Sequence, residues 1–220
     1  MVTTFPKGIP NPHLARQSLE NDPFPHVEIA PFMHVYSGSF DGQKFIEGIE
    51  IDGESTDWDQ SKTGSRRDGL KASNIRTSRG KDLDSMLGGA DPFADTYTEL
   101  QKIAYPVLYE AERAIWDYRR IYDLKLNDCQ AWSINKYGHG GQYKIHTDHG
   151  TNDPRIISCI VYLNTVKDGG VTVFPYQNVS VPSVEGNILV FPSSYVYSHA
   201  SEPTGLNSQE LKYSLAGFFV

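Results

Sequence analysis

The stretch from residue 156 to residue 164 reads IISCIVYLN, a run rich in β-branched and aromatic residues that predicts a β-strand. Five more short runs of this kind lie around it, at 129–136, 143–148, 171–175, 187–192 and 212–219. Turn residues separate them, as in Asp168-Gly169-Gly170 and Glu185-Gly186-Asn187. A closely spaced series of short strands with intervening turns is typical of a sandwich or jelly roll. We therefore expect a jelly-roll core over residues 129–220.

The N-terminal half carries mixed signals and is expected to support this core. Residues 26–37 (HVEIAPFMHVYS) alternate well enough for one or two strands, which Pro31 limits to an edge or a break. Between residues 93 and 118 apolar side chains recur at the spacing of a helix face, and Pro106 is expected to kink or split that segment. The predicted fold class is mainly β with supporting helices, a double-stranded β-helix (jelly roll) core, and helices packed on one face.

The size and composition of the chain predict one domain. With 220 residues and 39% hydrophobic content, the chain is long enough for one well-packed core and too short for two of comparable size. We expect a single domain over 1–220. In it, residues 1–128 supply N-terminal strands, a basic loop and support helices, and residues 129–220 supply the jelly-roll core.

The charge of the chain narrows its partners and its location. A formal net charge of −7 argues against nucleic acid, because an extended phosphate-binding surface needs clustered Lys and Arg. The sequence shows no signal peptide and no apolar run of transmembrane length, so we expect a cytoplasmic protein without a membrane partner. Its two cysteines, Cys129 and Cys159, lie among apolar residues and are expected to be reduced thiols. The oligomeric state is not indicated.

Three residues of the predicted core form a candidate metal site. His146 and Asp148 are two residues apart, so in a strand their side chains project from the same face. His199 is the only histidine downstream of His149 and is the one that a returning strand can bring beside them. Two histidines and one carboxylate on one face of an octahedron leave positions open for a co-substrate and O₂, as in Fe(II) oxygenases. An H-x-D tripeptide by itself is common, and its meaning here depends on the distal histidine.

Lys212 opens the last predicted strand, thirteen residues after His199, with Ser214 on the same side of that strand. A dicarboxylate that chelates iron through one end leaves a second carboxylate in the pocket, where it needs a charged partner. We expect Lys212 to be that partner, with further hydrogen bonds from Tyr137 and Thr172. The alternative is an exposed lysine at a strand edge.

The chain has one basic segment, between Lys62 and Lys81. Seven basic residues stand there against a single acid, Asp68: Lys62, Arg66, Arg67, Lys71, Arg76, Arg79 and Lys81. Two interpretations remain open, a solvated loop or a mobile segment that closes over an anionic or peptide ligand.

From about Cys129 to Phe219 the chain resembles the catalytic half of the prolyl 4-hydroxylase group of 2-oxoglutarate oxygenases. The resemblance rests on motifs in a fixed order: Tyr137-Gly138, Gln142-Tyr143-x-x-His146-x-Asp148, Arg155, Ile160-Val161-Tyr162-Leu163-Asn164, Gly169-Gly170-x-Thr172-x-Phe174-Pro175, Gly186-Asn187 through Phe191, His199 and Lys212. Upstream, Asn74-Ile75-Arg76-Thr77-Ser78-Arg79-Gly80 is similar to an Arg-Thr-Ser segment that these enzymes carry on a loop over peptide substrate.

The resemblance implies an oxidoreductase that hydroxylates a substrate with Fe(II), 2-oxoglutarate and O₂, and it suggests ascorbate as a further requirement. The implied ligands of the iron are His146, Asp148 and His199, which are also the catalytic residues, and the implied 2-oxoglutarate residues are Lys212, Tyr137 and Thr172. Tyr143, Arg155, Arg76 and Ser78 become candidate substrate contacts. The implied substrate is a proline within a peptide.

Other functions fit parts of the same pattern. A free amino acid or other small molecule would use the same iron site in a more enclosed pocket, and a nucleic-acid demethylase would share the metal ligands but not the acidic charge. A non-catalytic jelly-roll binding protein is the alternative of a different class, because a fold alone does not establish activity. The sequence also departs from the family: residues 202–210 lengthen the loop before Lys212, and no Trp follows Trp132. Both departures affect the substrate side of the pocket.

Overall fold

The computed structural model describes residues 12, 15, 23–51, 58–60, 62–63, 71–72, 75–88, 97–126, 129–150 and 154–220. Its helices are α2 (Gly42–Ile51), α3 (Leu83–Met86) and α4 (Glu99–Tyr122), with the short 3₁₀ helix η2 (Tyr195–Tyr197). Its strands are β1 (His26–Ala30), β2 (Met33–Ser37), β3 (Asp59–Gln60), β4 (Lys62–Thr63), β5 (Lys71–Ala72), β6 (Arg79–Asp82), β7 (Cys129–Tyr137), β8 (Gly141–His146), β9 (Ile157–Tyr162), β10 (Thr172–Phe174), β11 (Val179–Val181), β12 (Asn187–Pro192), β13 (His199–Thr204) and β14 (Lys212–Phe219).

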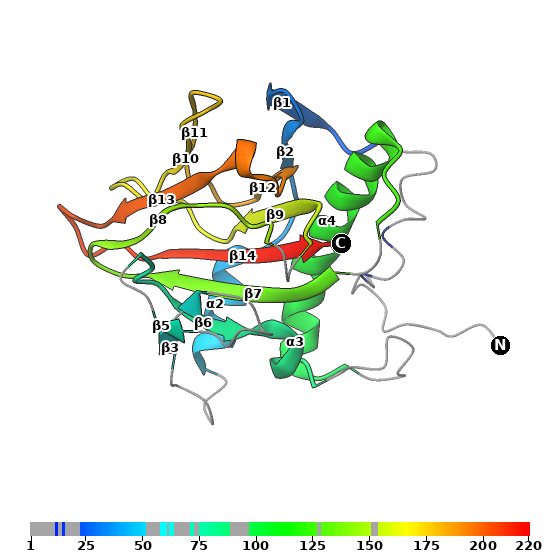
Figure 1. Cartoon of the computed structure of the whole chain (residues 1–220). Coiled ribbons are helices and arrows are strands. Elements are labelled where there is room, and N and C mark those ends of the chain that lie inside the picture. The colour runs from blue at the N-terminus through cyan, green and yellow to red at the C-terminus, as the bar shows by residue number, and fades with distance from the viewer. Residues whose placement is uncertain are drawn as a thin grey trace.

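The strands form two facing sheets. The larger sheet has the order β1-β2-β12-β9-β14-β7-β6-β3, the smaller has the order β11-β10-β13-β8, and β4 pairs with β5 separately. In the view of Figure 1, β8 and β13 lie across the front of the molecule, and α4 lies on the opposite side of the large sheet. The predicted fold class, mainly β with helices on one face, is confirmed.

Alternation along the strands of the large sheet explains its two faces. In β9, Cys159 and Val161 belong to the main hydrophobic core, which the helices cover. Their neighbour Tyr162 belongs instead to a second cluster between the sheets, together with Phe174 of β10 and Phe191 of β12. Because successive side chains of a strand point to opposite faces, one strand serves both layers. The layer between the sheets is the one that contains the candidate site.

The helices close the first face of the large sheet. Ala104, Val107, Leu108, Ala111 and Ile115 of α4 are buried in the main core. At the start of the helix, the Thr98 side chain accepts a hydrogen bond from the Gln101 backbone N–H, and the Gln101 side chain bonds back to Thr98 in a capping box. Pro106 lies inside a single helix, so of the two expected effects, a kink or a split, the split is excluded.

Two strands at the N-terminal end extend the jelly roll. β1 and β2 form an antiparallel hairpin whose turn contains Pro31, and β2 pairs with β12 of the core. The predicted interruption at Pro31 is therefore the turn of a hairpin. Of the basic segment, the structure describes β4, β5, Arg76, Arg79 and Lys81, whereas Arg66 and Arg67 lie outside the described residues.

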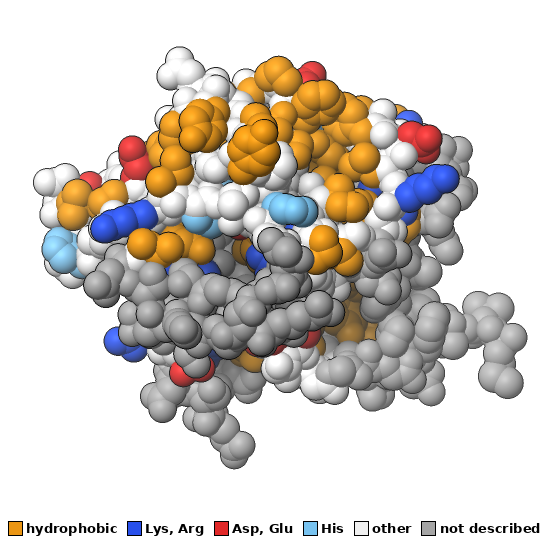
Figure 2. All heavy atoms as spheres, in the orientation of Figure 1, with side chains coloured by type: hydrophobic (Ala, Val, Ile, Leu, Met, Phe, Trp, Pro, Cys, Tyr) orange, Lys and Arg blue, Asp and Glu red, His pale blue; other side chains and the backbone are white. Residues whose placement is uncertain are grey.

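Exposed hydrophobic side chains gather on the upper part of the face in Figure 2, over the region where Figure 1 places β1, η2 and the turn between β10 and β11. Residues of these segments with large exposed side chains are Val27, Phe32, Tyr176, Tyr195 and Val196. None of the helices in the described ranges combines the length and apolar character that crossing a membrane requires. Cys159 is buried and Cys129 is half-buried, and both are thiols.

Candidate active site

Pairing between β8 and β13 brings the two predicted histidine ligands together. His146 is the last residue of β8, His199 is the first residue of β13, and the two are directly opposite each other in the antiparallel register. We expected Asp148 to lie in the same strand as His146, two residues further on. It lies instead in the loop just after β8. Ligand atoms of the three residues all lie within 4.8 Å of one another.

Backbone carbonyls fix the orientation of both imidazole rings. Nδ1 of His146 lies 2.9 Å from the carbonyl oxygen of Lys144, and Nδ1 of His199 lies 3.1 Å from that of Tyr197. A carbonyl can only accept a hydrogen bond, so in each ring Nδ1 carries the proton. Nε2 is then left with its lone pair, the form in which imidazole binds a metal.

Asp148 lies between the two rings. Its Oδ1 is 3.5 Å from Nε2 of His146, and its Oδ2 is 3.7 Å from Nε2 of His199. Burial alone would raise the pKa of Asp148, but the charges and hydrogen bonding of His199 and His146 hold it well below its ordinary value. Burial also lowers the pKa of His199 to about 4, so this ring is neutral at neutral pH. An ionised carboxylate with neutral imidazoles is the state that a divalent cation requires.

Aromatic rings pack around the two histidines. The ring of Tyr143 stacks on His146 with centroids 3.5 Å apart. Phe174 and Phe191 flank His199, with centroid distances of 5.2 and 4.9 Å. This packing fixes the imidazole planes and keeps one side of the cluster apolar.

Lys212 lies deep in the layer between the sheets. The residue is 2% exposed, and its Nζ donates hydrogen bonds to the carbonyl of Gly170 at 2.6 Å and to Oγ of Ser201 at 2.9 Å. Within the described residues no carboxylate forms an ion pair with it. Burial lowers its pKa to about 7. The alternative of an exposed edge lysine is thereby excluded. An ammonium group has three donors, so Lys212 keeps one for a ligand.

The two other predicted carboxylate contacts lie near Lys212. Tyr137 is buried, with the Nζ of Lys212 5.3 Å from its ring centroid. Thr172 is buried on β10, where its Oγ1 accepts a hydrogen bond from the hydroxyl of Tyr162 at 2.8 Å. The hydroxyl of Thr204 is buried without a hydrogen-bond partner among the described residues. These buried polar groups include an unpaired hydroxyl and an ammonium group with a spare donor, and this chemistry fits a carboxylate.

Two of the four candidate substrate residues contact the predicted iron ligands directly. The ring of Tyr143 stacks on His146, and the Arg155 guanidinium stacks over Phe218 and donates to the Asp148 carbonyl at 3.4 Å. The Arg76 guanidinium lies over the Tyr143 ring at 4.7 Å, donates to Oγ of the buried Ser78 at 2.9 Å, and also donates to Oδ1 of Asn135. Contact of these four residues with a substrate stays a prediction.

Residues 132–220 match the family model of the 2OG-Fe(II) oxygenase superfamily. Over 77 residues the chain is 38% identical to prolyl 4-hydroxylase subunit alpha-3 of Homo sapiens, an alignment that covers 30% of this chain and 14% of that protein. Over 105 residues it is 32% identical to subunit alpha-1 of Gallus gallus, covering 38% of this chain and 20% of that protein. The chain thus spans a fifth or less of the length of these curated relatives.

Solved structures extend the similarity to nearly the whole chain. A Pseudomonas putida prolyl-4-hydroxylase has a TM-score of 0.57 at 20% identity, with 96% of this chain and 99% of that chain covered. A Trichoplax adhaerens prolyl hydroxylase, solved with a peptide fragment of the hypoxia inducible factor oxygen degradation domain, has a TM-score of 0.61 at 17% identity, with 95% and 90% covered. The chain is similar to prolyl 4-hydroxylases in sequence over its C-terminal part and in fold over nearly its whole length. The predicted resemblance and the predicted jelly-roll fold are confirmed.

The match of residues 132–220 to the 2OG-Fe(II) oxygenase superfamily model implies Fe(II), 2-oxoglutarate and O₂ as the cofactor and co-substrates. The donor set fits the metal, since two imidazole nitrogens and one carboxylate with open positions suit Fe(II). The pocket around Lys212 fits the far carboxylate of 2-oxoglutarate, since it offers a buried cation and an unpaired hydroxyl.

Several residues beside Lys212 were not predicted from the sequence. Ser201, Tyr162 and Thr204 contact Lys212 or line the space beside it. Ser201 follows His199 by two residues on β13, so the same alternation that served for His146 and Asp148 could have identified it. Gly170 was part of the quoted motif, but its carbonyl has a role only once the Gly169-Gly170 turn is seen, where φ is positive at both residues.

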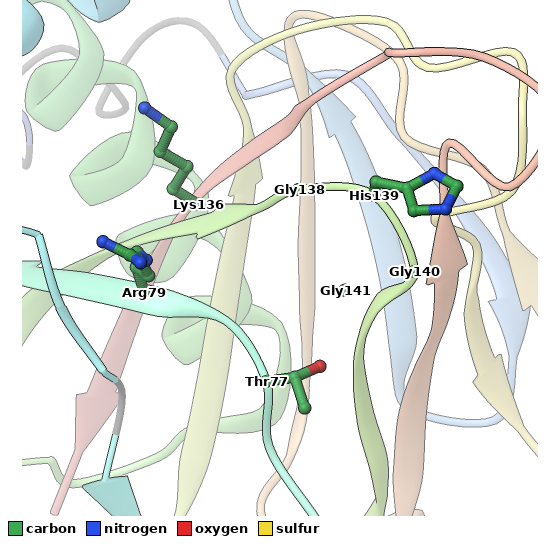
Figure 3. A pocket seen from close by; sticks show the side chains of 7 residues that line it. All are labelled: Thr77, Arg79, Lys136, Gly138, His139, Gly140 and Gly141. Atoms are coloured by element: carbon green, nitrogen blue, oxygen red, sulfur yellow. The ribbon is translucent and has the colours of Figure 1, made fainter.

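A separate pocket of about 360 Å³ opens beside the turn between β7 and β8. Its lining residues are Thr77, Arg79, Lys136, Gly138, His139, Gly140 and Gly141. In Figure 3 the side chains of Arg79 and Lys136 extend to one side and that of His139 to the other. Because its basic groups diverge, the pocket is not organised around one anion. It does continue the surface of the Arg76–Ser78 segment, through Thr77.

Proposed function

We propose that this protein is an Fe(II)- and 2-oxoglutarate-dependent hydroxylase that acts on a proline within a peptide. The observation that carries the proposal is the convergence of His146, Asp148 and His199, with Nε2 of both rings free to bind a metal. A buried Lys212 without a carboxylate partner in the described residues adds the second half of the site. The 220 residues would then form one dioxygenase domain, since strands from both halves complete the large sheet.

In this proposal His146, Asp148 and His199 hold Fe(II), and Lys212 pairs with the far carboxylate of 2-oxoglutarate. Tyr137 and Thr172 line that end of the pocket. When bound, the iron and its co-substrates supply oxidation: 2-oxoglutarate and O₂ become succinate and CO₂, and one oxygen atom enters a C–H bond of the substrate. Ascorbate fits as a reductant that keeps the iron in its Fe(II) state.

The protein's own part in the reaction is geometric. The carbonyls of Lys144 and Tyr197 keep the imidazoles in the metal-binding tautomer, and the stacked Tyr143 holds His146 in its plane. Phe174 and Phe191 exclude water from one side of the cluster. What remains for the substrate is the side that Arg76 and Arg155 border, where it is held with one C–H bond near the metal.

A peptide is the substrate class that the molecule supports best. The relatives are subunits of prolyl 4-hydroxylases, and the Trichoplax adhaerens structure contains a peptide fragment. Arg76, over the Tyr143 ring, and Arg155, over the Phe218 ring, offer two guanidinium groups near the cluster, which suits the carbonyl groups of a peptide backbone. The apolar surface over η2 lies next to His199 in sequence and suits a peptide better than a nucleic acid, which needs a basic surface.

A free amino acid or another small molecule is the second candidate. It uses the same iron site, and Arg155 or Arg76 could pair with its carboxylate. The two candidates differ in whether activity survives when the residues that flank a proline are removed.

The test is mass spectrometry of proline-containing peptides after incubation with Fe(II), 2-oxoglutarate and ascorbate. A gain of one oxygen on proline is expected, together with one succinate for each hydroxylation. Peptides with proline replaced by alanine, and free proline, are the controls. If free proline is hydroxylated and no peptide is, the result would favour an enzyme that acts on a small molecule.

The ligand assignment is tested with His199→Ala and Asp148→Ala. Each is expected to lower succinate formation by at least a factor of about 100 while leaving the circular dichroism spectrum unchanged, because loss of a metal ligand removes the reaction centre and not the core. If neither variant of a folded protein loses turnover, these residues do not bind the catalytic metal.

A further inference from the structure

Two buried serines lie directly behind the candidate metal carboxylate. Ser158 of β9 and Ser193, which follows β12, are each 1% exposed. Oγ of Ser158 lies 2.7 Å from Oδ2 of Asp148, and the two serine Oγ atoms lie 2.7 Å apart. Neither serine belongs to the motifs that the sequence pattern singled out, and neither offers a metal ligand atom to the cluster.

The direction of these hydrogen bonds follows from the donors available. An ionised carboxylate only accepts, so Ser158 donates its single proton to Asp148. In the bond between the two serines, the proton then comes from Ser193. The result is an ordered chain from Ser193 to Ser158 to Asp148, in which each bond strengthens the next.

Ser193 also holds the loop that carries Asp148. Its backbone carbonyl accepts hydrogen bonds from Oγ1 of Thr147 and from the backbone N–H of His149, both at 3.0 Å. The residues on either side of Asp148 are therefore anchored to the same residue whose hydroxyl begins the chain. Backbone and carboxylate of the loop are fixed together.

We propose that Ser158 and Ser193 are positioning residues for the metal carboxylate. The inference rests on the proposed metal site. With Oδ2 engaged by Ser158, the carboxylate presents Oδ1 to the metal, next to Nε2 of His146. One oxygen then binds where two could, and a coordination position stays open for the co-substrates. The hydroxyl pair acts through Asp148 and does not touch the metal.

A purely structural role makes a different prediction. Buried hydroxyl groups need partners wherever they lie, and two serines that satisfy each other add only to the stability of the fold. The two roles separate when both hydroxyls are removed. Ser158→Ala alone leaves the Ser193 hydroxyl unpaired, whereas the double variant Ser158→Ala/Ser193→Ala leaves no orphan donor and still deprives Asp148 of its hydrogen bond.

The experiment is titration of the metal-free full chain with Co(II), followed by visible absorption, together with thermal unfolding of each metal-free variant. Ser158→Ala and the double variant are expected to weaken Co(II) binding by roughly 10- to 100-fold, the usual effect of losing a partner behind a metal ligand. Ser193→Ala should weaken it less. The absorption bands of bound Co(II), which report the coordination number, should change in the first two variants.

Ser183→Ala is the matched control. Ser183 is also fully buried and also donates one hydrogen bond, to the carbonyl of Asn164 at 2.9 Å, but it has no contact with Asp148. Its Co(II) affinity and spectrum should equal those of the unaltered protein. If the unaltered protein binds Co(II) and the double variant binds it equally well with the same spectrum, the positioning role is wrong and the metal site stands. If the unaltered protein binds no Co(II), the metal site itself is wrong.

Discussion

Lys212 shows how one residue can be costly to the fold and necessary to the site. A buried ammonium group loses its hydration, and the two hydrogen bonds to Gly170 and Ser201 replace only part of it. The lowered pKa of Lys212, about 7, expresses that loss. A ligand carboxylate would return a counter-charge to this position and raise the pKa again.

The affinity for 2-oxoglutarate should therefore fall as the pH rises. The ligand-binding form of Lys212 is protonated, and in the ligand-free protein that form is lost above a pKa of about 7. The apparent Kd should rise by about tenfold for each pH unit above that value. Calorimetric titration of the Mn(II)-loaded protein at a series of pH values measures it. A constant Kd over about two pH units above neutrality would contradict the assignment.

Lys212→Met should stabilise the ligand-free protein. The pKa of Lys212 in the folded chain, about 7, lies below its ordinary value of 10.5, so between these values the folded state binds fewer protons than the unfolded state. The contribution of Lys212 to the free energy of unfolding is thus most unfavourable below pH 7, and it becomes less unfavourable as the pH rises towards 10.5. Methionine removes the penalty, and the Tm at neutral pH should rise by about 2–4 °C for each kcal/mol regained.

The matched control for this change is Lys136→Met. Lys136 forms an ion pair with Glu50 at 2.7 Å, so its loss should lower the Tm or leave it unchanged. Binding of 2-oxoglutarate should disappear in Lys212→Met only. A Tm for Lys212→Met below that of the unaltered protein at neutral pH would show that the two hydrogen bonds outweigh the buried charge.

The candidate site residues with unusual side-chain chemistry could be identified from the sequence alone. His146, Asp148, His199 and Lys212 carry side chains that are rare inside a jelly roll, and the structure brings the first three together and buries the fourth. Ser158 and Ser193 could not be found this way, because serine is common and their partner is set by the pairing of β9 with β12. The role of a serine hydroxyl depends on the residues that the fold places beside it, and the local sequence does not show them.

The bounds of a strand could be predicted from the local sequence where the side chains of one face, or of both faces, are buried. β12 and β14 have the predicted bounds, since most of their residues are buried. β13 was missed, because its sequence HASEPT contains Glu202 and Pro203 and has no apolar alternation. The residues just before it form the 3₁₀ helix η2. β13 is a strand because β8 and β10 pair with it on both sides, which no local pattern records.

Gly217 of β14 leaves room for the ring of Trp132, its partner on the neighbouring strand β7. A Cβ atom at this position would lie 2.4 to 2.7 Å from atoms of the Trp132 ring. Gly217→Ala should therefore destabilise the fold by roughly 1–3 kcal/mol, because an indole packed in the sheet cannot move aside without strain. Urea unfolding followed by Trp fluorescence measures the change.

Gly138→Ala is the control for Gly217→Ala, since the nearest atom to its added Cβ is Leu211 Cδ2 at 3.9 Å, an ordinary contact. It should alter stability by less than about 0.5 kcal/mol, as surface substitutions usually do. Equal losses in both variants would mean that the Trp132 contact does not determine the effect, because the entropy of the unfolded chain favours alanine over glycine.

The whole molecule separates its stabilising core from its reactive centre. The main core joins α2, α4 and one face of the large sheet, and it contains none of the three candidate iron ligands. One of them, His199, lies against Phe174 and Phe191 of the smaller cluster between the sheets. The other two lie beside His199. Within the described residues, then, the metal is not needed to hold the layers together.

Removal of the metal should therefore leave the protein folded. Small zinc domains unfold when a chelator takes their ion, because they have no other core. Here a chelator should leave the circular dichroism spectrum unchanged, and the metal should act as a ligand of the native state. At a free concentration 100 times its Kd, a metal stabilises by about 2.7 kcal/mol, which for a chain of this size raises the Tm by roughly 5–10 °C.

Melting with a chelator, with Mn(II), and with Mn(II) plus 2-oxoglutarate checks this separation. The Tm should rise in that order, because 2-oxoglutarate adds its contact with Lys212 to the bound metal. In Asp148→Ala the Mn(II) step should be lost while the chelator-treated Tm stays near that of the unaltered protein. Unfolding at 25 °C on chelation alone would place the metal among the supports of the fold, and the division between a stable helix-covered core and an open site would be wrong.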